Sequence, residues 1–206
     1  MYQDDQWQEV DGDELEGFVE QVHPIDGRHK VSSSTSKVHW RMLPWYENIA
    51  MIRVMDSGWE NPDLRVYYLA REGQLYRLNG TSPPIHEVNE VAPIKVTEDN
   101  VLEYLEFFCF FVRGEEGPFL MVESMDNPYL PEGLDDARLK AIESVIRPAT
   151  FEGYNSEGHF LADAVVYYSN ALFLSNFAIH STGMIEMTDD DPLLGDLPVK
   201  VDAPVS

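Results

Sequence analysis

The first half of the chain contains short runs in which apolar residues, many of them β-branched or aromatic, favour β-strands. Such runs cover residues 49–55 and 64–71. The second run meets residues 74–78 across Glu72-Gly73, a plausible two-residue hairpin turn. Residues 79–89 (NGTSPPIHEVN) follow, and their two prolines lack the N–H that a strand ladder needs. We therefore expect a surface loop there.

Two later segments repeat apolar residues every three or four positions, which predicts amphipathic helices. The first follows Thr97, a good N-cap residue, and has an apolar stripe from Val101 to Val112. Gly114 is well placed to end it. The second helix covers residues 134–147, and Pro148 closes it.

The last part of the chain changes to a period of two, which is typical of strands with one buried face. HFLADAVVYY begins at His159 and ALFLSNFAIH ends at His180, with a Ser169-Asn170 turn between them, and MIEM follows a second turn. These segments predict a three-stranded antiparallel meander. A shorter strand is expected over residues 119–124.

Together these patterns predict an α+β fold, in which an antiparallel sheet of the early strands and the C-terminal meander is covered by two helices. The order of strand and helix runs argues against a parallel doubly wound sheet, but it leaves the strand order open. We expect an acidic N-terminal segment with a Ser-rich linker over residues 1–37 and a single domain over residues 38–188. An acidic, Pro-rich tail is expected over residues 189–206.

Acidic residues far outnumber basic ones, since 37 Asp and Glu against 14 Lys and Arg give a formal net charge of -23. This charge repels phosphates and anionic lipid head groups, so we expect no direct nucleic acid partner and no membrane partner. It attracts a basic protein partner, in an association that weakens as salt is added. Solubility alone is the other explanation for such a composition.

The chain start has neither a basic region nor an apolar region of the kind that a secretory signal peptide needs. Its longest apolar run, residues 107–112, is far shorter than the ~20 residues that span a bilayer. The single cysteine, Cys109, agrees with a reducing compartment. We therefore expect a cytoplasmic protein, while its oligomeric state is left open.

Cys109 raises the question of whether it is a nucleophile or a core residue. A reactive cysteine needs thiolate character, which a helix N-terminus, a nearby cation or a paired histidine supplies. Cys109 instead lies among aromatic residues near the end of the first predicted helix. We expect it to be a packing residue with a raised pKa.

The meander places a group of polar residues on one face. A two-residue turn at 169–170 fixes the hairpin register, so that His159 faces His180, with Glu157 two residues away. Two imidazoles and a carboxylate are the ligands of a two-His, one-carboxylate metal site. A divalent metal bound by Glu157, His159 and His180 is thus one hypothesis, and a solvent-facing histidine pair is the alternative.

The 79–89 segment supplies a second candidate site. Ser82 and His86 share it, and Glu87 or Glu90 would be the orienting acid of a triad, although triads are defined by geometry and not by proximity in sequence. The alternative is a rigid proline turn with hydrogen-bonding side chains. We note Ser82, His86 and Glu87 as candidate partner- or ligand-binding residues. Nucleotide-binding glycine motifs and C-x-x-C redox motifs are absent from the sequence.

No complete catalytic constellation is recognisable, so we assign no catalytic residue and predict no cofactor. The hypothesis that the sequence favours is a noncatalytic, acidic binding or regulatory protein that engages a basic protein partner. The alternative is a small enzyme, with or without a divalent metal, that uses His159, His180 and Glu157 or the 79–90 segment. An enclosed pocket at these residues would favour the enzyme.

Overall fold

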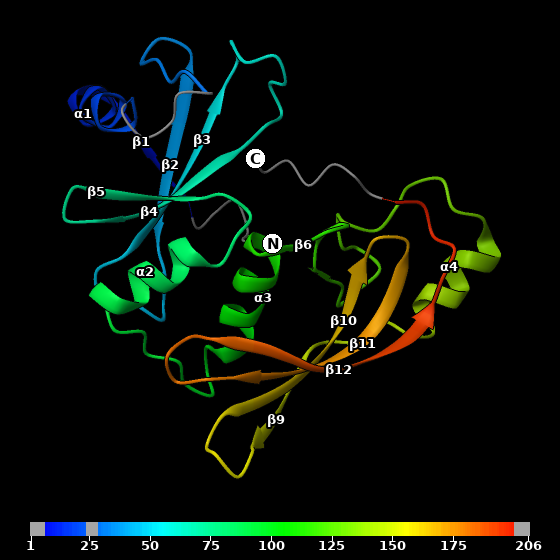
Figure 1. Cartoon of the computed structure of the whole chain (residues 1–206). Coiled ribbons are helices and arrows are strands. Elements are labelled where there is room, and N and C mark those ends of the chain that lie inside the picture. The colour runs from blue at the N-terminus through cyan, green and yellow to red at the C-terminus, as the bar shows by residue number, and fades with distance from the viewer. Residues whose placement is uncertain (1–6, 24–28, 200–206) are drawn as a thin grey trace. The chain divides into compact units, whose positions relative to one another are not determined.

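The computed structural model describes residues 7–23 and 29–199 and combines α-helices with antiparallel β-sheets (Figure 1). This confirms the predicted α+β class. Between Pro93 and Ile94 the chain divides into two compact units, here called the N-terminal unit and the C-terminal unit. The predicted single domain, residues 38–188, spans this division.

The N-terminal unit contains one five-stranded sheet in which the strands follow in chain order, each antiparallel to the next. The strands are β1 (Gln8–Val10), β2 (Ser36–Met42), β3 (Ala50–Asp56), β4 (Val66–Arg71) and β5 (Gln74–Leu78). The predicted hairpin between β4 and β5 is present. Its turn residues Glu72 and Gly73 have φ angles of 49° and 79°, as a two-residue hairpin turn requires.

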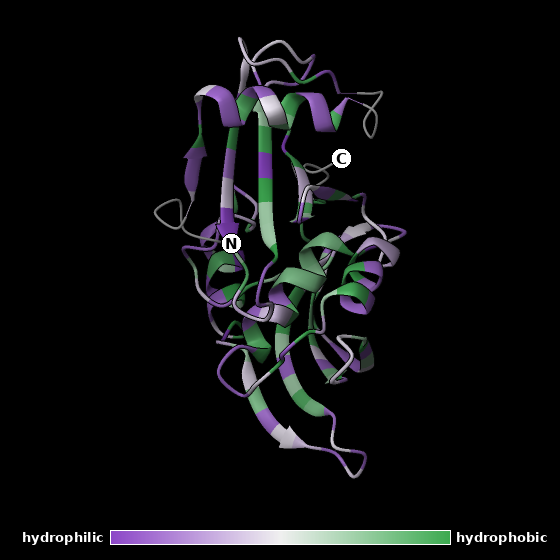
Figure 2. Cartoon of the chain, turned by 90° about the vertical axis from the view of Figure 1, so that its left-hand side faces the viewer, coloured by the Kyte–Doolittle hydropathy of each residue, from purple (hydrophilic) through white to green (hydrophobic). Residues whose placement is uncertain are grey.

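Helix α1 (Gly12–Val22) contributes to an apolar cluster with one face of this sheet. Its apolar residues recur at i, i+3, i+4 and i+7, so they lie on a single stripe. The cluster joins Phe18 and Val22 of α1 to buried strand residues that include Val38, Val54 and Tyr68. In Figure 2, hydrophilic and hydrophobic residues alternate along strands. Because successive side chains of a strand point to opposite faces, the sheet face away from this cluster receives polar side chains.

Two predictions for the N-terminal unit are wrong. Residues 1–37 were expected to be an acidic segment with a Ser-rich linker outside the domain, but the described residues of this range supply β1, α1 and the start of β2, because their apolar side chains are spaced to reach the core. Residues 1–6 and 24–28 lie outside the described residues. The expected loop at residues 79–89 is mostly helix α2 (Pro83–Val91). Its two prolines occupy the first helical turn, where no N–H donor is needed.

The C-terminal unit contains a second sheet, of strand order β12-β11-β10-β8, with β9 also paired to β10. The early strands and the meander therefore form separate sheets, and the predicted shared sheet is wrong. Two short strands, β6 and β7, form a ribbon of their own. The strands are β6 (Arg113–Gly114), β7 (Gly117–Pro118), β8 (Leu120–Met121), β9 (Thr150–Tyr154), β10 (Phe160–Tyr168), β11 (Ala171–Ile179) and β12 (Ile185–Leu194).

The register expected for the β10–β11 hairpin is confirmed. Tyr168 pairs with Ala171, and the pairing continues without interruption to Phe160 and Ile179. Ser169 adopts a φ of 54°, which the tight turn at 169–170 requires. The two-residue turn and the period-two pattern were sufficient to place these side chains.

Helix α3 (Val101–Phe111) supplies much of the core of the C-terminal unit. Seven of its residues are buried, and the Tyr104 hydroxyl donates a 2.5 Å hydrogen bond to the carbonyl of Gly183. The helix ends at Phe111, earlier than the predicted Gly114, which lies in β6. Gly114 has a different role, because a Cβ there would collide with the Tyr168 hydroxyl and lie 3.1 Å from the Phe119 ring.

The second predicted helix is shorter than expected, and so is the predicted tail. Helix α4 covers Asp136–Glu143, and the Asp135 side chain caps it by accepting a 2.8 Å hydrogen bond from the Arg138 N–H.

The expected tail, residues 189–206, begins inside β12, which continues to Leu194. Residues 200–206 lie outside the described residues. Over the described ranges, none of the helices has the length and apolar character needed to cross a membrane.

Candidate functional site

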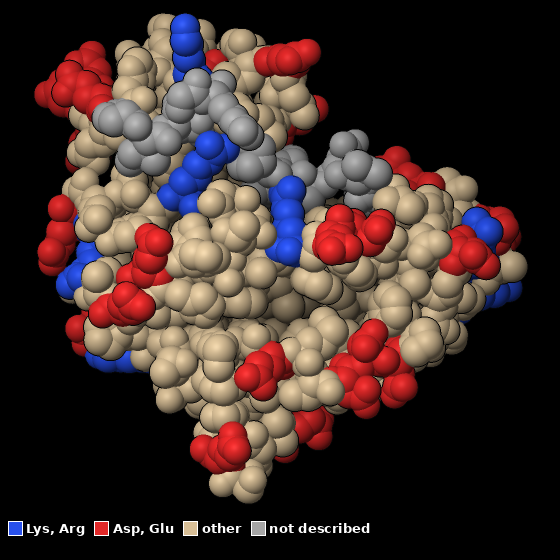
Figure 3. Space-filling view, in the orientation of Figure 1, with Lys and Arg blue, Asp and Glu red and all other residues tan. Residues whose placement is uncertain are grey.

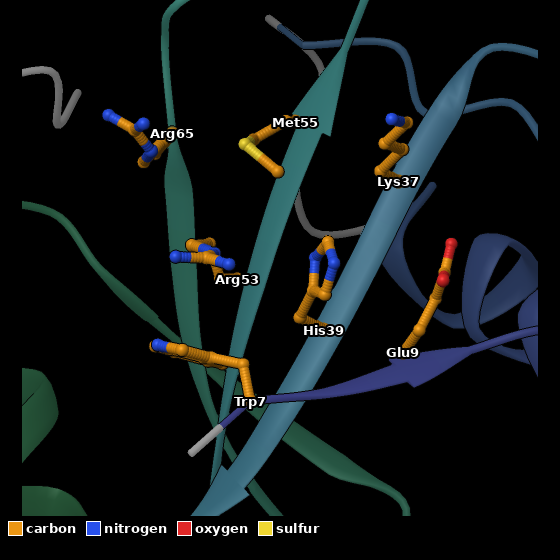
Figure 4. A pocket seen from close by; sticks show the side chains of 7 residues that line it. All are labelled: Trp7, Glu9, Lys37, His39, Arg53, Met55 and Arg65. Atoms are coloured by element: carbon orange, nitrogen blue, oxygen red, sulfur yellow. The ribbon is translucent and has the colours of Figure 1, made fainter. Parts of the chain in front are cut away.

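The face of the N-terminal sheet opposite Val38 and Val54 carries a pocket of about 430 Å³ (Figure 4). Its described lining residues are Trp7, Glu9, Lys37, His39, Arg53, Met55 and Arg65. This described part of the lining contains three permanently cationic side chains, one imidazole and one carboxylate. Lys37 and Glu9 are exposed, whereas the other lining residues are half-buried.

Strand alternation and register bring these residues together. Lys37 and His39 point to the same face of β2 because they are two positions apart. Val38, which lies between them, is buried and points to the opposite face. Lys37 pairs with Met55, and His39 pairs with Arg53 on β3 and with Glu9 on β1. Directly opposed residues on one face have Cβ atoms about 5 Å apart. Figure 4 shows the resulting group of side chains, drawn from neighbouring strands.

An aromatic side chain positions one of the cations. The Arg53 guanidinium lies over the Trp7 ring, with its central carbon 4.4 Å from the ring centroid. The Trp7 ring also contacts Tyr67 at a centroid distance of 6.3 Å. A guanidinium stacked on an indole is held in position by the electrostatic attraction of the ring quadrupole. Arg53 is therefore preorganised beside the pocket.

The described residues of this pocket carry a net positive charge, whereas the net charge of the chain is negative. Acidic residues outnumber Lys and Arg by 37 to 14 over the whole sequence, and Figure 3 shows many more acidic than basic side chains on the face it displays. Among the lining residues that the structure describes the ratio is reversed, because three cations, Lys37, Arg53 and Arg65, accompany one carboxylate, that of Glu9. Because basic residues are so few in this chain, three of them on one sheet face are a distinctive feature of the fold.

A second charged feature is the edge strand β12 of the C-terminal unit. Residues 186–192 of this strand are all exposed, and they include Glu186, Asp189, Asp190 and Asp191. In the order of the sheet, β12 is terminal and pairs with β11 on one side. Among the described residues no strand pairs with its other edge, which presents backbone N–H and C=O groups between carboxylates that alternate from one face of the strand to the other. The pairing with β11 shifts register twice, as bulged edge strands do.

The predicted histidine pair forms, but its rings stack. The His159 and His180 ring centroids are 3.7 Å apart with an interplanar angle of 21°, and each ring lies near a glutamate. His159 Nδ1 is 3.7 Å from Glu157, while His180 Nε2 is 3.6 Å from Glu186. The nitrogen lone pairs of stacked rings lie in nearly parallel planes, so they do not converge on one ion.

The arrangement of Glu157, His159 and His180 therefore lends no support to the metal hypothesis, which stays a prediction. A wider search agrees with this geometry. Within residues 7–23 and 29–199, no group of three or more His, Cys, Asp or Glu side chains is arranged to hold a metal ion.

The other candidate residues lie at the start of α2. Ser82 precedes the helix, and its carbonyl oxygen accepts hydrogen bonds from the N–H groups of Ile85 and His86. His86 and Glu87 are consecutive helical residues, so their side chains diverge by about 100° around the helix axis. This spacing does not give the sequential contacts of a triad. A binding role for Ser82, His86 and Glu87 remains a prediction.

Cys109 behaves as the sequence suggested. Its side chain is buried in α3, and burial, with a smaller contribution from the charge of Glu106, raises the thiol pKa from 9.0 to about 12. A thiol of this kind is neutral at ordinary pH and is therefore a weak nucleophile.

The basic pocket escaped the sequence analysis. Its residues are spread from Trp7 to Arg65, and their proximity depends on the register of neighbouring strands. A signal was nevertheless present in SKVHWRM, where basic and apolar residues alternate with the period of a strand. The preceding serines made this segment resemble a linker. In comparisons with known proteins, no protein-family model, no curated protein and no solved structure matches this chain.

Proposed function

We propose that this chain is a noncatalytic cytoplasmic binding protein whose C-terminal unit engages an extended, basic segment of a partner protein along strand β12. The observation that carries the proposal is the combination of an open sheet edge with exposed carboxylates at Glu186 and at residues 189–191. A basic strand that pairs with β12 would bond to its free backbone groups and place lysine or arginine side chains near these acids.

The charge of the edge also favours one class of partner over others. Acidic side chains on an edge strand keep it from pairing with a second copy of itself, because like charges would be brought into opposition. The same repulsion acts against acidic segments of other proteins. A cationic strand is the occupant for which the charges become attractive, and the net charge of -23 steers it toward the molecule.

The experiment uses the full chain and a synthetic peptide in which Lys and Val alternate, with affinity measured by calorimetry. We expect saturable binding that weakens with salt and protects backbone amides of β12 from hydrogen exchange. A peptide of the same sequence with N-methylated amides keeps the charge but loses the strand hydrogen bonds. This peptide should bind much more weakly.

A charge-matched pair of variants separates binding at β12 from general attraction. Replacing Asp189, Asp190 and Asp191 by Asn should lower the affinity by roughly 10-fold, the effect of losing several exposed ion pairs. The control replaces exposed acids of α1 by Gln, at Glu14, Glu16 and Glu20, and removes the same charge. Equal weakening in both variants, or equal binding of the N-methylated peptide, would refute pairing at β12.

A further inference from the structure

The basic pocket of the N-terminal unit is unrelated to the acidic edge, and its chemistry suits a ligand of the opposite sign. Lys37, Arg53 and Arg65 give it an excess of positive charge over Glu9. Arginine presents its N–H donors as a planar fork that matches the oxygens of phosphate, and lysine adds a point charge. We propose that this pocket binds a small phosphorylated molecule through its phosphate dianion.

Geometry supports a site for a whole small molecule. The volume of about 430 Å³ is within the range of ligand pockets, which is about 300–1,000 Å³. The lining also offers uncharged contact surface, from the Trp7 ring and the Met55 side chain. In Figure 4 the cationic side chains stand on both sides of Met55, which lies on β3 between Arg65 and Lys37.

Screening explains how an acidic protein retains an anion site. At physiological salt, charges more than about 8 Å away contribute little to the potential felt by a small exposed ligand. A small dianion in this pocket therefore responds mainly to the nearby cations. A nucleic acid strand extends far beyond the pocket and meets the many acidic groups of the chain, whose net charge is -23. The site thus favours a small phosphate ester over a polyanion.

Binding is tested by titrating the full chain with phenyl phosphate, inorganic phosphate and a single-stranded oligonucleotide, using calorimetry in a buffer free of phosphate. Phenyl phosphate should bind saturably and more tightly than inorganic phosphate, because the ester group adds contacts with Trp7 and Met55. Equal affinity for the two would indicate a site for free phosphate and overturn the assignment to a phosphorylated molecule. Tighter binding of the oligonucleotide would overturn it as well.

Three variants, each with one cation removed, locate the site. Lys37→Gln and Arg65→Gln should each weaken phenyl phosphate binding about 10-fold or more, as expected for the loss of a charge-assisted hydrogen bond. Lys140→Gln removes the same charge from an exposed position of α4 and should leave the affinity unchanged. Circular dichroism confirms that each variant is folded. No binding of phenyl phosphate by the unmodified chain, or equal weakening by Lys140→Gln, would overturn the proposal.

Discussion

The two antiparallel sheets of this chain place their charged side chains in different ways. In the N-terminal unit, cations from β2 and β3 gather on one sheet face with Arg65, beside an aromatic ring. In the C-terminal unit, carboxylates follow one edge strand, and the sheet supplies many of its residues to a buried core. Directly opposed side chains on a face lie about 5 Å apart at their Cβ atoms, whereas those on an edge strand are spread along the strand beside outer backbone groups.

This difference determines the shape of ligand that each sheet suits. Cations gathered from neighbouring strands suit a compact anion, whereas carboxylates spread along an edge strand suit an extended cationic segment. Net charge alone would have suggested one electrostatic character for the whole molecule. The distribution of charge over the two units is instead the basis for the two separate binding preferences proposed above.

The largest expected effect is a difference in thiol labelling rate between Cys109, in the core of the C-terminal unit, and a cysteine introduced on the open sheet face of the N-terminal unit. Because burial raises its pKa to about 12 from 9.0, labelling by a thiol reagent at pH 8 should be roughly 1,000-fold slower than for a free cysteine. A cysteine placed in the open basic pocket, by Lys37→Cys, should react rapidly, and the reaction is followed by absorbance. Rapid labelling of the unmodified folded chain would show that the core around α3 is not sealed.

A smaller effect concerns the packing of the C-terminal unit. Gly114→Ala should lower the free energy of unfolding by about 2 kcal/mol, because the new methyl group meets the Tyr168 hydroxyl and the Phe119 ring. The Tyr168 ring cannot swing away freely, since it stacks on Phe119 at 4.5 Å and its hydroxyl accepts a hydrogen bond from the Glu116 N–H. Urea denaturation measures the change.

The matched control for Gly114→Ala is Gly17→Ala in helix α1 of the N-terminal unit. A Cβ at Gly17 has no neighbouring atom within 4 Å, so the substitution should raise stability by about 0.5–1 kcal/mol through helix propensity. Equal effects of the two substitutions would contradict the packing difference between these sites.

An effect smaller than that of Gly114→Ala tests whether charge within the C-terminal sheet is paired. Arg147 donates a 2.8 Å hydrogen bond to Asp163, whose side chain is 13% exposed, and this contact raises the pKa of Arg147. Arg147→Leu should cost about 1 kcal/mol by leaving that carboxylate without its cation. Adding Asp163→Asn should recover part of the loss in thermal denaturation. A double variant as unstable as the sum of both single variants would show that the pair is not coupled.

The sequence predicted the C-terminal hairpin better than any other part of the fold. Its two-residue turn and uninterrupted alternation determine both the register and the pairing of Asp163 with Asn176. The same local rules failed for α2, because adjacent prolines are compatible both with a loop and with the first turn of a helix. They also failed for β12, because Asp and Pro are unfavourable in central strands but are accepted at an edge.

The basic pocket could not be derived from local patterns. Alternation predicts that Lys37 and His39 share a face, but it does not show that Arg53 lies opposite His39 or that Trp7 stacks on its guanidinium. Those contacts depend on strands that are distant in sequence. The predicted histidine pair illustrates the converse, since correct register brought His159 and His180 together without revealing that their rings stack.

The most direct test of the account is a combined titration of the isotopically labelled full chain, followed by amide chemical shifts. Phenyl phosphate should perturb residues around Lys37 and Arg53, and the alternating Lys and Val peptide should perturb β12, with both ligands bound at once. If both ligands instead perturb one common set of residues, or if neither produces a localised change, the assignment of opposite binding preferences to the two sheets is wrong.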